Sequence, residues 1–120
     1  MISLNYFNDE EFKRAVPACS LSDMDEDFMA RLDIAREVAG VPFIINSAYR
    51  TRDYEKSKGR PGTSQHCYGR AVDLCCRSND VRFRIVDALL VAGFRRIGIA
   101  QTFIHVDSGY PNASPLIWLY

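Results

Sequence analysis

The stretch Ser64-Gln65-His66-Cys67-Tyr68-Gly69-Arg70-Ala71-Val72-Asp73 decides how this chain is interpreted, and Phe103-Ile104-His105-Val106-Asp107 follows it later in the sequence. Together the two stretches hold both histidines of the protein, and each ends on an aspartate. Small and apolar residues fill 71–76 and 102–107, and this composition predicts a β-strand in each. Gly69 predicts a tight bend or a close backbone approach just before the first strand.

The predicted strands bring histidine and aspartate side chains within reach of one another. Alternate residues of a strand share a face, so His105 and Asp107 point one way, and Asp73 can face His105 across paired strands. His66 arrives from the loop before the first strand. Two imidazoles and one carboxylate form a donor set that holds catalytic zinc and leaves a fourth position for water. On spacing alone, surface or hydrogen-bonded histidines are an equally good interpretation, and both stay open at this point.

Four motifs in one order resemble those of the zinc D-Ala-D-Ala carboxypeptidase family. They are the S-x-H-x-x-G-x-A-x-D pattern of residues 64–73, Ser47-Ala48-Tyr49-Arg50, Arg96-Ile97-Gly98-Ile99 and Phe103-Ile104-His105-Val106-Asp107. The family also holds phage L-Ala-D-Glu endolysins and D-Ala-D-Ala dipeptidases, and it shares its fold with the Hedgehog signalling domain. The resemblance runs from about Phe43 to Trp118, and it looks closest to the short branch found in phage genomes, small single-stranded DNA phages included.

The resemblance implies a zinc ion held by His66, Asp73 and His105. It also implies a substrate-binding hydroxyl at Ser64, for which a capping or turn hydroxyl is the alternative. Arg50 matches the family's motif directly after a predicted buried strand, where its planar guanidinium suits a carboxylate or a developing oxyanion. We therefore expect Arg50 to act in catalysis and substrate binding, and the alternative is a surface salt bridge.

The chain departs from the family at the general base. Family members usually carry Glu or His two or three positions before the last zinc-binding histidine, whereas this chain has Thr102 and Phe103 there. Neither side chain can take a proton from water. Asp107, on the same strand face as His105, is the candidate catalytic base, and its alternative role is to orient the imidazole of His105.

Length and composition fit one soluble globular domain spanning residues 1–120. The 120-residue chain is large enough for one core, and its 48% hydrophobic residues match a folded domain. Lys+Arg 15 against Asp+Glu 15 leave no net charge to attract nucleic acid, so we expect no nucleic-acid partner. No apolar run approaches the roughly 18–20 residues of a membrane span, so we expect no membrane partner. We also expect a monomer.

The N-terminus and the cysteines indicate the compartment. Residues 1–6 have neither the basic start nor the apolar core of a secretory signal, so we expect no signal peptide and synthesis in the cytoplasm. A phage-encoded enzyme of this kind would need help from elsewhere to reach the host cell wall. Without export, reduced thiols are expected at Cys19, Cys67, Cys75 and Cys76.

A long amphipathic helix is predicted between Ser22 and Gly40. Ser22 is expected to be its N-cap, with Asp25 completing an imperfect capping box, and Gly40 supplies the stop. The remaining segments are expected, in chain order, as a short helix at 8–13, a strand at 41–46, helical turns at 51–58, a loop at 59–63, a helix from Ser78 to Gly93, a strand at 94–100, a tight connection at 101–102 and a final strand or docked segment at 116–120.

Apolar residues in the second half of the chain lead to further expectations. The helix after Ser78 is expected to bury one apolar stripe, which consists of Val81, Ile85, Ala88, Leu89 and Ala92. Phe83, Val86 and Leu90 are expected to widen this buried stripe. The small Gly98 is expected to let a neighbour approach the sheet closely. Trp118 lines the cleft or covers the hydrophobic core, and the core is the preferred interpretation.

These observations predict an α+β fold, a small and mainly antiparallel sheet with helices on its outer faces, of the Hedgehog and D,D-peptidase type. The predicted function is zinc-dependent hydrolysis of an amide bond in peptidoglycan stem peptides, as a D,D-carboxypeptidase or an endopeptidase of the endolysin type. The alternative is a zinc-containing, Hedgehog-like binding or structural module without hydrolytic activity, which the absence of Glu or His before His105 favours. Zero net charge disfavours a third candidate, a nucleic-acid binder.

Overall fold

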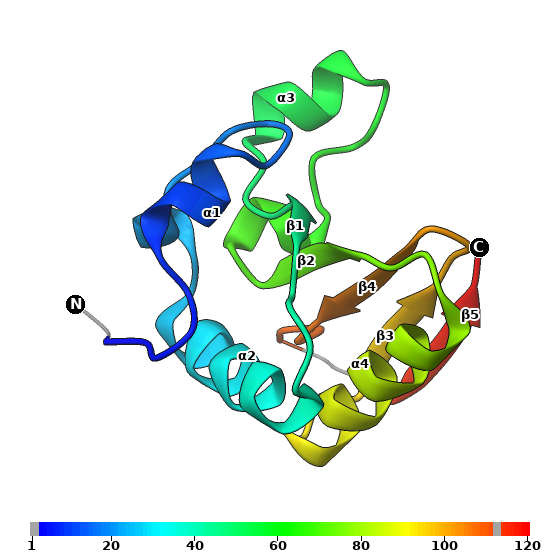
Figure 1. Cartoon of the computed structure of the whole chain (residues 1–120). Helices are drawn as coiled ribbons and strands as arrows, with labels where there is room; N and C mark the ends of the chain where they lie inside the picture. The colour runs from blue at the N-terminus through cyan, green and yellow to red at the C-terminus, as the bar shows by residue number, and fades with distance from the viewer. Residues whose placement is uncertain (1–2, 112–113) are drawn as a thin grey trace.

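The computed structural model describes residues 3–111 and 114–120 of the chain (Figure 1). Its elements in chain order are α1 (Asp9–Lys13), the 3₁₀ turn η1 (Leu21–Asp23), α2 (Glu26–Ala39), β1 (Ile45–Ser47), α3 (Arg52–Ser57), the 3₁₀ turn η2 (Gln65–Tyr68), β2 (Ala71–Cys75), α4 (Asn79–Val91), β3 (Arg96–Ile99), β4 (Phe103–Asp107) and β5 (Leu116–Leu119). No helix in the described part of the chain combines the length and apolar character needed to cross a membrane.

The five strands form one mixed sheet in the order β1-β2-β4-β3-β5. The pairs β1–β2, β2–β4 and β3–β4 are antiparallel, whereas β5 pairs with β3 in parallel. Helices flank this sheet, so the predicted α+β class and mainly antiparallel sheet are confirmed. The predicted hairpin is also confirmed, because β3 and β4 join through residues 100–102 and Ala100 N–H donates to the carbonyl of Phe103.

One face of the sheet forms the hydrophobic core with helices α2 and α4. The central strands contribute fully buried side chains, which are Val72, Leu74, Ile97, Ile104 and Val106. They join Leu32 of α2 and Leu89 of α4 in one cluster, and the two helices pack side by side in Figure 1. Burial of each such side chain contributes about 1.5–3 kcal/mol before the entropy of ordering is subtracted. This core fixes the strands and therefore the register on the opposite face.

A single row of residues crosses that opposite face from strand to strand. Ser47 pairs with Asp73, Asp73 with His105, His105 with Gly98, and Gly98 with Trp118. Directly paired residues point to the same side of a sheet. The expectation that Asp73 and His105 face each other is therefore confirmed, and Trp118 lies two strands away from His105 in the same row.

The predicted start of the long helix is wrong. Ser22 lies inside η1, and α2 begins at Glu26 with Asp25 as its N-cap, whose carboxylate accepts a hydrogen bond from Phe28 N–H at 2.9 Å. Asp23 instead caps the preceding turn by accepting from Ser20 N–H at 2.9 Å. Each aspartate thus satisfies its own turn, and an extended residue separates the two turns. The predicted stop at Gly40 is confirmed by its left-handed φ of 66°.

Two strands are shorter than predicted, and α4 is less buried than predicted. In place of the strand predicted at 41–46, β1 spans Ile45–Ser47, and Pro42 has no N–H to donate to a ladder. The strand predicted at 94–100 spans Arg96–Ile99. On α4 the expected widening of the buried stripe is wrong for Phe83 and Leu90, which are 71% and 48% exposed. Only the side of α4 that meets α2 and the sheet is covered.

Candidate metal centre

His66 is placed by a short turn rather than by the loop that the sequence predicted. It lies on η2, which ends at Gly69 with a left-handed φ of 68°. A Cβ at Gly69 would lie 2.5 Å from the carbonyl oxygen of Asp23, so this close approach requires glycine. Nδ1 of His66 donates to the carbonyl oxygen of Ala48 at 2.6 Å, since a carbonyl can only accept. The other ring nitrogen, Nε2, is therefore the one left to bind a metal.

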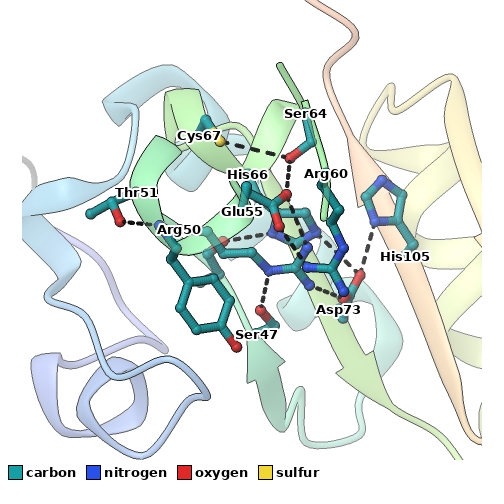
Figure 2. A network of polar contacts seen from close by, with 12 residues as sticks. Ser47, Arg50, Thr51, Glu55, Arg60, Ser64, His66, Cys67, Asp73 and His105 are labelled. Atoms are coloured by element: carbon teal, nitrogen blue, oxygen red, sulfur yellow. Dashed lines mark hydrogen bonds and ion pairs between the residues drawn. The ribbon is translucent and has the colours of Figure 1, made fainter. Parts of the chain in front are cut away.

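Asp73 lies between the two imidazoles. Its Oδ1 is 3.5 Å from Nε2 of His66 and 2.8 Å from Nδ1 of His105. The second ring nitrogen of His105, Nε2, is 2.7 Å from Oδ2 of Asp107. Figure 2 shows His66 and His105 on opposite sides of the Asp73 carboxylate. Each imidazole thus turns one nitrogen toward Asp73 and the other toward a fixed acceptor, Ala48 or Asp107.

This donor set fits a zinc ion. One ligand atom from each of His66, Asp73 and His105 lies within 4.8 Å of the other two. Two imidazole nitrogens and one carboxylate oxygen are ligands that zinc accepts, with a further position for water. A carboxylate or a carbonyl oxygen on the second nitrogen of each histidine is the usual way of fixing the ring and its tautomer at a zinc site. His66 and His105 are 3% and 8% exposed, so the surrounding protein holds both rings in place.

The charges of the site shift three pKa values. Burial alone would raise the pKa of Asp73, but hydrogen bonds from His105 and His66 outweigh burial, and the pKa lies well below its ordinary value. Burial would likewise lower the pKa of His105, yet Asp107 and Asp73 raise it. The pKa of Asp107 is lowered because contacts with His105 and Arg96 outweigh the effect of burial. The metal-free site therefore favours ionised carboxylates next to a protonated His105.

Arg50 lies at this site and is tied to it by each of its nitrogens. Nε donates to Ser47 Oγ at 2.9 Å, and one terminal nitrogen donates to Asp73 Oδ2 at 3.1 Å. The other terminal nitrogen is 3.5 Å from a carboxylate oxygen of Glu55. The surface salt bridge considered as an alternative does not describe Arg50, because its side chain is only 16% exposed and one partner is Asp73 itself.

Glu55 is the functional candidate that the sequence analysis missed. Its side chain is 1% exposed and accepts hydrogen bonds from Ser64 Oγ at 2.9 Å and from Arg60. Ser64 is thus connected to Arg50 through one buried carboxylate (Figure 2). Burial would raise the pKa of Glu55, but the hydrogen bonds from Arg60 and Ser64 and the charge of Arg50 lower it. Glu55 is therefore held as an anion.

A signal for Glu55 does exist in the sequence. The helix α3 has the sequence Arg-Asp-Tyr-Glu-Lys-Ser, which offers no aliphatic side chain to bury. A helix that packs against the protein must then bury a polar or aromatic residue, and a buried carboxylate requires cationic partners. Arg50 and Arg60 flank the helix at either end. That pattern indicates a buried ion cluster, although it does not select Glu55 over Asp53.

Trp118 lies on the metal-ligand face of the sheet, so the preferred interpretation of this residue as a core cover is wrong. The ring centroids of Trp118 and His105 are 5.4 Å apart, and the guanidinium of Arg96 lies 5.4 Å from the Trp118 ring. A Cβ at Gly98 would lie 2.6 Å from Trp118 ring atoms. The expectation that Gly98 admits a close neighbour is thereby confirmed. The indole forms a wall beside the last metal-ligand candidate.

The cysteines stand apart from this donor set. All four, each within the described residues, are free thiols. Among the described residues, the cluster of metal-binding side chains consists of His66, Asp73 and His105 without a cysteine. Cys67 comes near the site through Ser64, with the sulfur 4.0 Å from Oγ. Cys76 is buried, as a small hydrophobic residue would be.

Neither the curated proteins nor the solved structures gave a match to this chain. The sequence model of one family, described as Peptidase M15, matches residues 5–107. The matched range contains His66, Asp73, His105, Arg50 and Glu55, and it ends before β5 and Trp118. With most of its length matched, the chain belongs to the peptidase M15 family, whose members are zinc-dependent metallopeptidases.

Proposed function

We propose that this protein is a zinc peptidase that hydrolyses an amide bond in peptidoglycan stem peptides. The reaction is of the D,D-carboxypeptidase or the endopeptidase type, the fold is of the Hedgehog and D,D-peptidase type, and the chain belongs to the short, phage-type branch. One observation carries the proposal. Ligand atoms of His66, Asp73 and His105 lie within 4.8 Å of one another, and Arg50 donates a hydrogen bond to the carboxylate of Asp73.

The chain's own residues would build the reaction centre as follows. His66, Asp73 and His105 would hold a zinc ion, which would supply a water molecule of lowered pKa and polarisation of the scissile carbonyl. Ala48 and Asp107 fix the two imidazoles by accepting from their second nitrogens. Arg50 holds Asp73 in place and puts a positive charge next to the developing oxyanion. Ser64, whose hydroxyl proton is committed to Glu55, keeps lone pairs for a substrate N–H.

The contacts of Asp107 support the orienting role over the role of base. Its Oδ2 faces His105 Nε2, its Oδ1 accepts from Arg96 Nε at 2.8 Å, and the residue is 4% exposed. A base must reach the proton of the attacking water, and both oxygens of Asp107 already have partners. The same contacts favour the second candidate function, a zinc-containing module that binds peptides without hydrolysing them.

The balance of charge at the centre supports an anionic substrate. Three carboxylates (Asp73, Asp107 and Glu55) face three guanidiniums (Arg50, Arg60 and Arg96). Zinc binding requires both imidazoles to be neutral, so these six charges cancel and the divalent ion leaves an excess of two positive charges. Stem peptides carry free carboxylates, so the field of the loaded site would draw them in.

Muropeptide digestion by zinc-loaded protein tests the proposal. We expect mass spectrometry to detect a shortened or cleaved stem peptide, and His66→Ala to abolish both the product and stoichiometric zinc. Asp87→Asn, an exposed carboxylate on α4, serves as the control and should match the unmodified protein. Stoichiometric zinc without any product would leave the binding module as the function. Absence of zinc from protein purified with the ion would reject both candidates.

A further inference from the structure

Arg50 and Arg60 both contact the buried carboxylate of Glu55 beside the metal centre. They differ in how many of their N–H donors remain available for a ligand. Arg50 is 16% exposed, and each of its three nitrogens faces an acceptor on Ser47, Asp73 or Glu55. Arg60 is 50% exposed, and among the contacts of the described residues its side chain meets Glu55 through one terminal nitrogen. Four of the five N–H donors of a guanidinium sit on the two terminal nitrogens, so Arg60 keeps donors for a ligand.

Glu55 holds Arg60 at two points. The carboxylate of Glu55 accepts from the Arg60 guanidinium, and the Arg60 backbone N–H donates to the Glu55 carbonyl oxygen at 3.0 Å. The chain can double back in this way because Gly59 adopts a left-handed φ of 76°. Ser64 and Arg50 meet the second oxygen of Glu55, so the carboxylate cannot rotate away. A guanidinium fixed like this loses little entropy when it binds a ligand.

The same contacts aim Arg60 at the metal centre. Figure 2 shows its side chain extending from the loop past Glu55 toward Asp73, with His105 beyond it. The Glu55 carboxylate chiefly, and the charge of Asp73 in smaller part, raise the pKa of Arg60. The arginine therefore stays charged, and half of its side chain is open to solvent.

We propose that Arg60, held in place by Glu55, binds a carboxylate of the peptide substrate, whereas Arg50 is committed to Asp73. This assignment rests on the proposed peptidase function and extends it to the residue that selects the substrate. The ligand class is a peptide with a free carboxylate next to the scissile bond, which a planar guanidinium can bind through two parallel hydrogen bonds. Glu55 is the positioning residue, and it does not itself touch the substrate.

Three forms of one synthetic stem pentapeptide ending in D-Ala-D-Ala test the assignment. One form carries all its carboxylates, one has a C-terminal carboxamide, and one has the D-Glu α-carboxylate amidated. For each form, zinc-loaded protein gives kcat and KM where hydrolysis occurs, and Kd where it does not. We expect the unmodified protein to bind one amidated form about 10- to 100-fold more weakly, the size of a hydrogen-bonded charge contact.

Arg60→Ala should remove this preference, because it weakens the binding of the carboxylate form alone. We expect KM or Kd for that form to rise, with kcat nearly constant and zinc affinity unaltered. Arg60→Lys retains a cation for Glu55, and should keep only part of the preference because the planar fork is lost. It also reports on the assignment if Arg60→Ala does not fold. Glu55→Gln should reduce the preference while Arg60 is still present. Arg84→Ala, an exposed arginine of α4, is the matched control and should retain the full preference.

The outcomes separate this assignment from the function on which it rests. A preference that survives in both Arg60 variants, or no preference in the unmodified protein, would overturn the role of Arg60. If the preference depends on Arg60 but none of the three peptides is cleaved, the role of Arg60 stands and the hydrolytic function is rejected. Equal weakening of all three forms by Arg60→Ala would indicate a structural role only, and would also overturn the assignment.

Discussion

At the scale of single residues, the site depends on side chains that hold other side chains. Asp107 is the clearest case, because its carboxylate bridges the imidazole of His105 and the guanidinium of Arg96. If Asp107 orients His105, Asp107→Asn should lower zinc affinity by about 10- to 100-fold, because the amide is a poorer acceptor for the ring N–H. Competition with a chromogenic chelator measures this. A catalytic base would give the opposite pattern, with zinc affinity kept and kcat reduced.

Glu55 is a second side chain that holds other side chains, and we expect its substitution to lower the stability of the protein. Glu55→Gln keeps the shape of the side chain but removes the charge that faces Arg50 and Arg60. Because the carboxylate is 1% exposed, we expect the free energy of unfolding to fall by about 1.5–3 kcal/mol, the range for hydrogen bonds to charged groups. Urea unfolding of metal-free protein measures the change. Asp53→Asn, exposed on the same helix, should shift it by less than about 0.5 kcal/mol.

The resemblance to a known motif, added to residue chemistry, predicted part of this candidate site. His66, Asp73, His105, Arg50 and Ser64 could be predicted, because their spacing matches a recurring motif and their side chains are the usual ligands of metals and carboxylates. Glu55 and Arg60 could not be selected in the same way. The residues around α3 indicate a buried ion cluster, but the motif contains neither residue, and charged residues in a polar helix are normally solvated. Their importance comes from the burial of the Glu55 carboxylate, which depends on how Arg50, Arg60 and Ser64 meet α3 in the fold.

At the scale of elements, the docking of β5 depends on Gly98. The Trp118 ring occupies the space that a side chain at position 98 would need, at 2.6 Å from a hypothetical Cβ. Gly98→Ala should therefore displace the indole, cost about 1–3 kcal/mol in the free energy of unfolding, and change the fluorescence of the one tryptophan. The Tyr120 ring lies 2.7 Å from the same hypothetical Cβ, so most of that cost should disappear in a background that carries both Trp118→Ala and Tyr120→Ala. An equal cost in both backgrounds would mean that the strain lies in the backbone of β3 instead.

Which elements form could be predicted better than where they begin. Hydrophobic periodicity predicted the two long helices, and the tight connection at 101–102 predicted the hairpin. The end of the chain was predicted as a strand or a docked segment, and it forms the strand β5. The start of α2 was misplaced because three capping residues, Ser20, Ser22 and Asp25, compete within six positions, and tertiary contacts decide between them. Asp25 N–H donates to the carbonyl of Gly69 at 2.9 Å, and no local sequence pattern predicts that hydrogen bond.

At the scale of the whole molecule, the site is a row across the sheet together with one histidine from outside it. Asp73, His105, Gly98 and Trp118 come from four strands whose order, β2-β4-β3-β5, differs from their order in the chain. Pairing of Asp73 with His105 could be predicted from alternation along two strands. The place of Trp118 could not, because it requires β5 to pair in parallel with β3, a choice made by packing rather than by local sequence.

Because of this arrangement, the stability of the whole fold should depend on pH, and the dependence above about pH 6.5 should differ between metal-free and zinc-loaded protein. In metal-free protein the pKa of His105 is raised from 6.5. Its contribution to the free energy of unfolding is therefore complete below that value and is lost as pH rises through the folded-state pKa. The pKa values of Asp73 and Asp107 are lowered from 3.8, so their contributions are present above that value and are lost as pH falls. Metal-free protein should therefore be most stable between about pH 4 and 6.5, the interval set by those two ordinary values.

Zinc should oppose the loss of stability that metal-free protein undergoes as pH rises. The ion needs deprotonated imidazoles, so the rise in Tm that it causes should grow as pH increases from about 6.5 to about 8, the range in which metal-free protein loses stability. Thermal melts across this range, with a chelator and then with zinc, measure both curves. His105→Ala should flatten the alkaline fall of the first curve and remove the growing gap to the second. A gap that stays constant with pH, or one that persists in His105→Ala, would mean that zinc binds outside the row that joins Asp73 to His105.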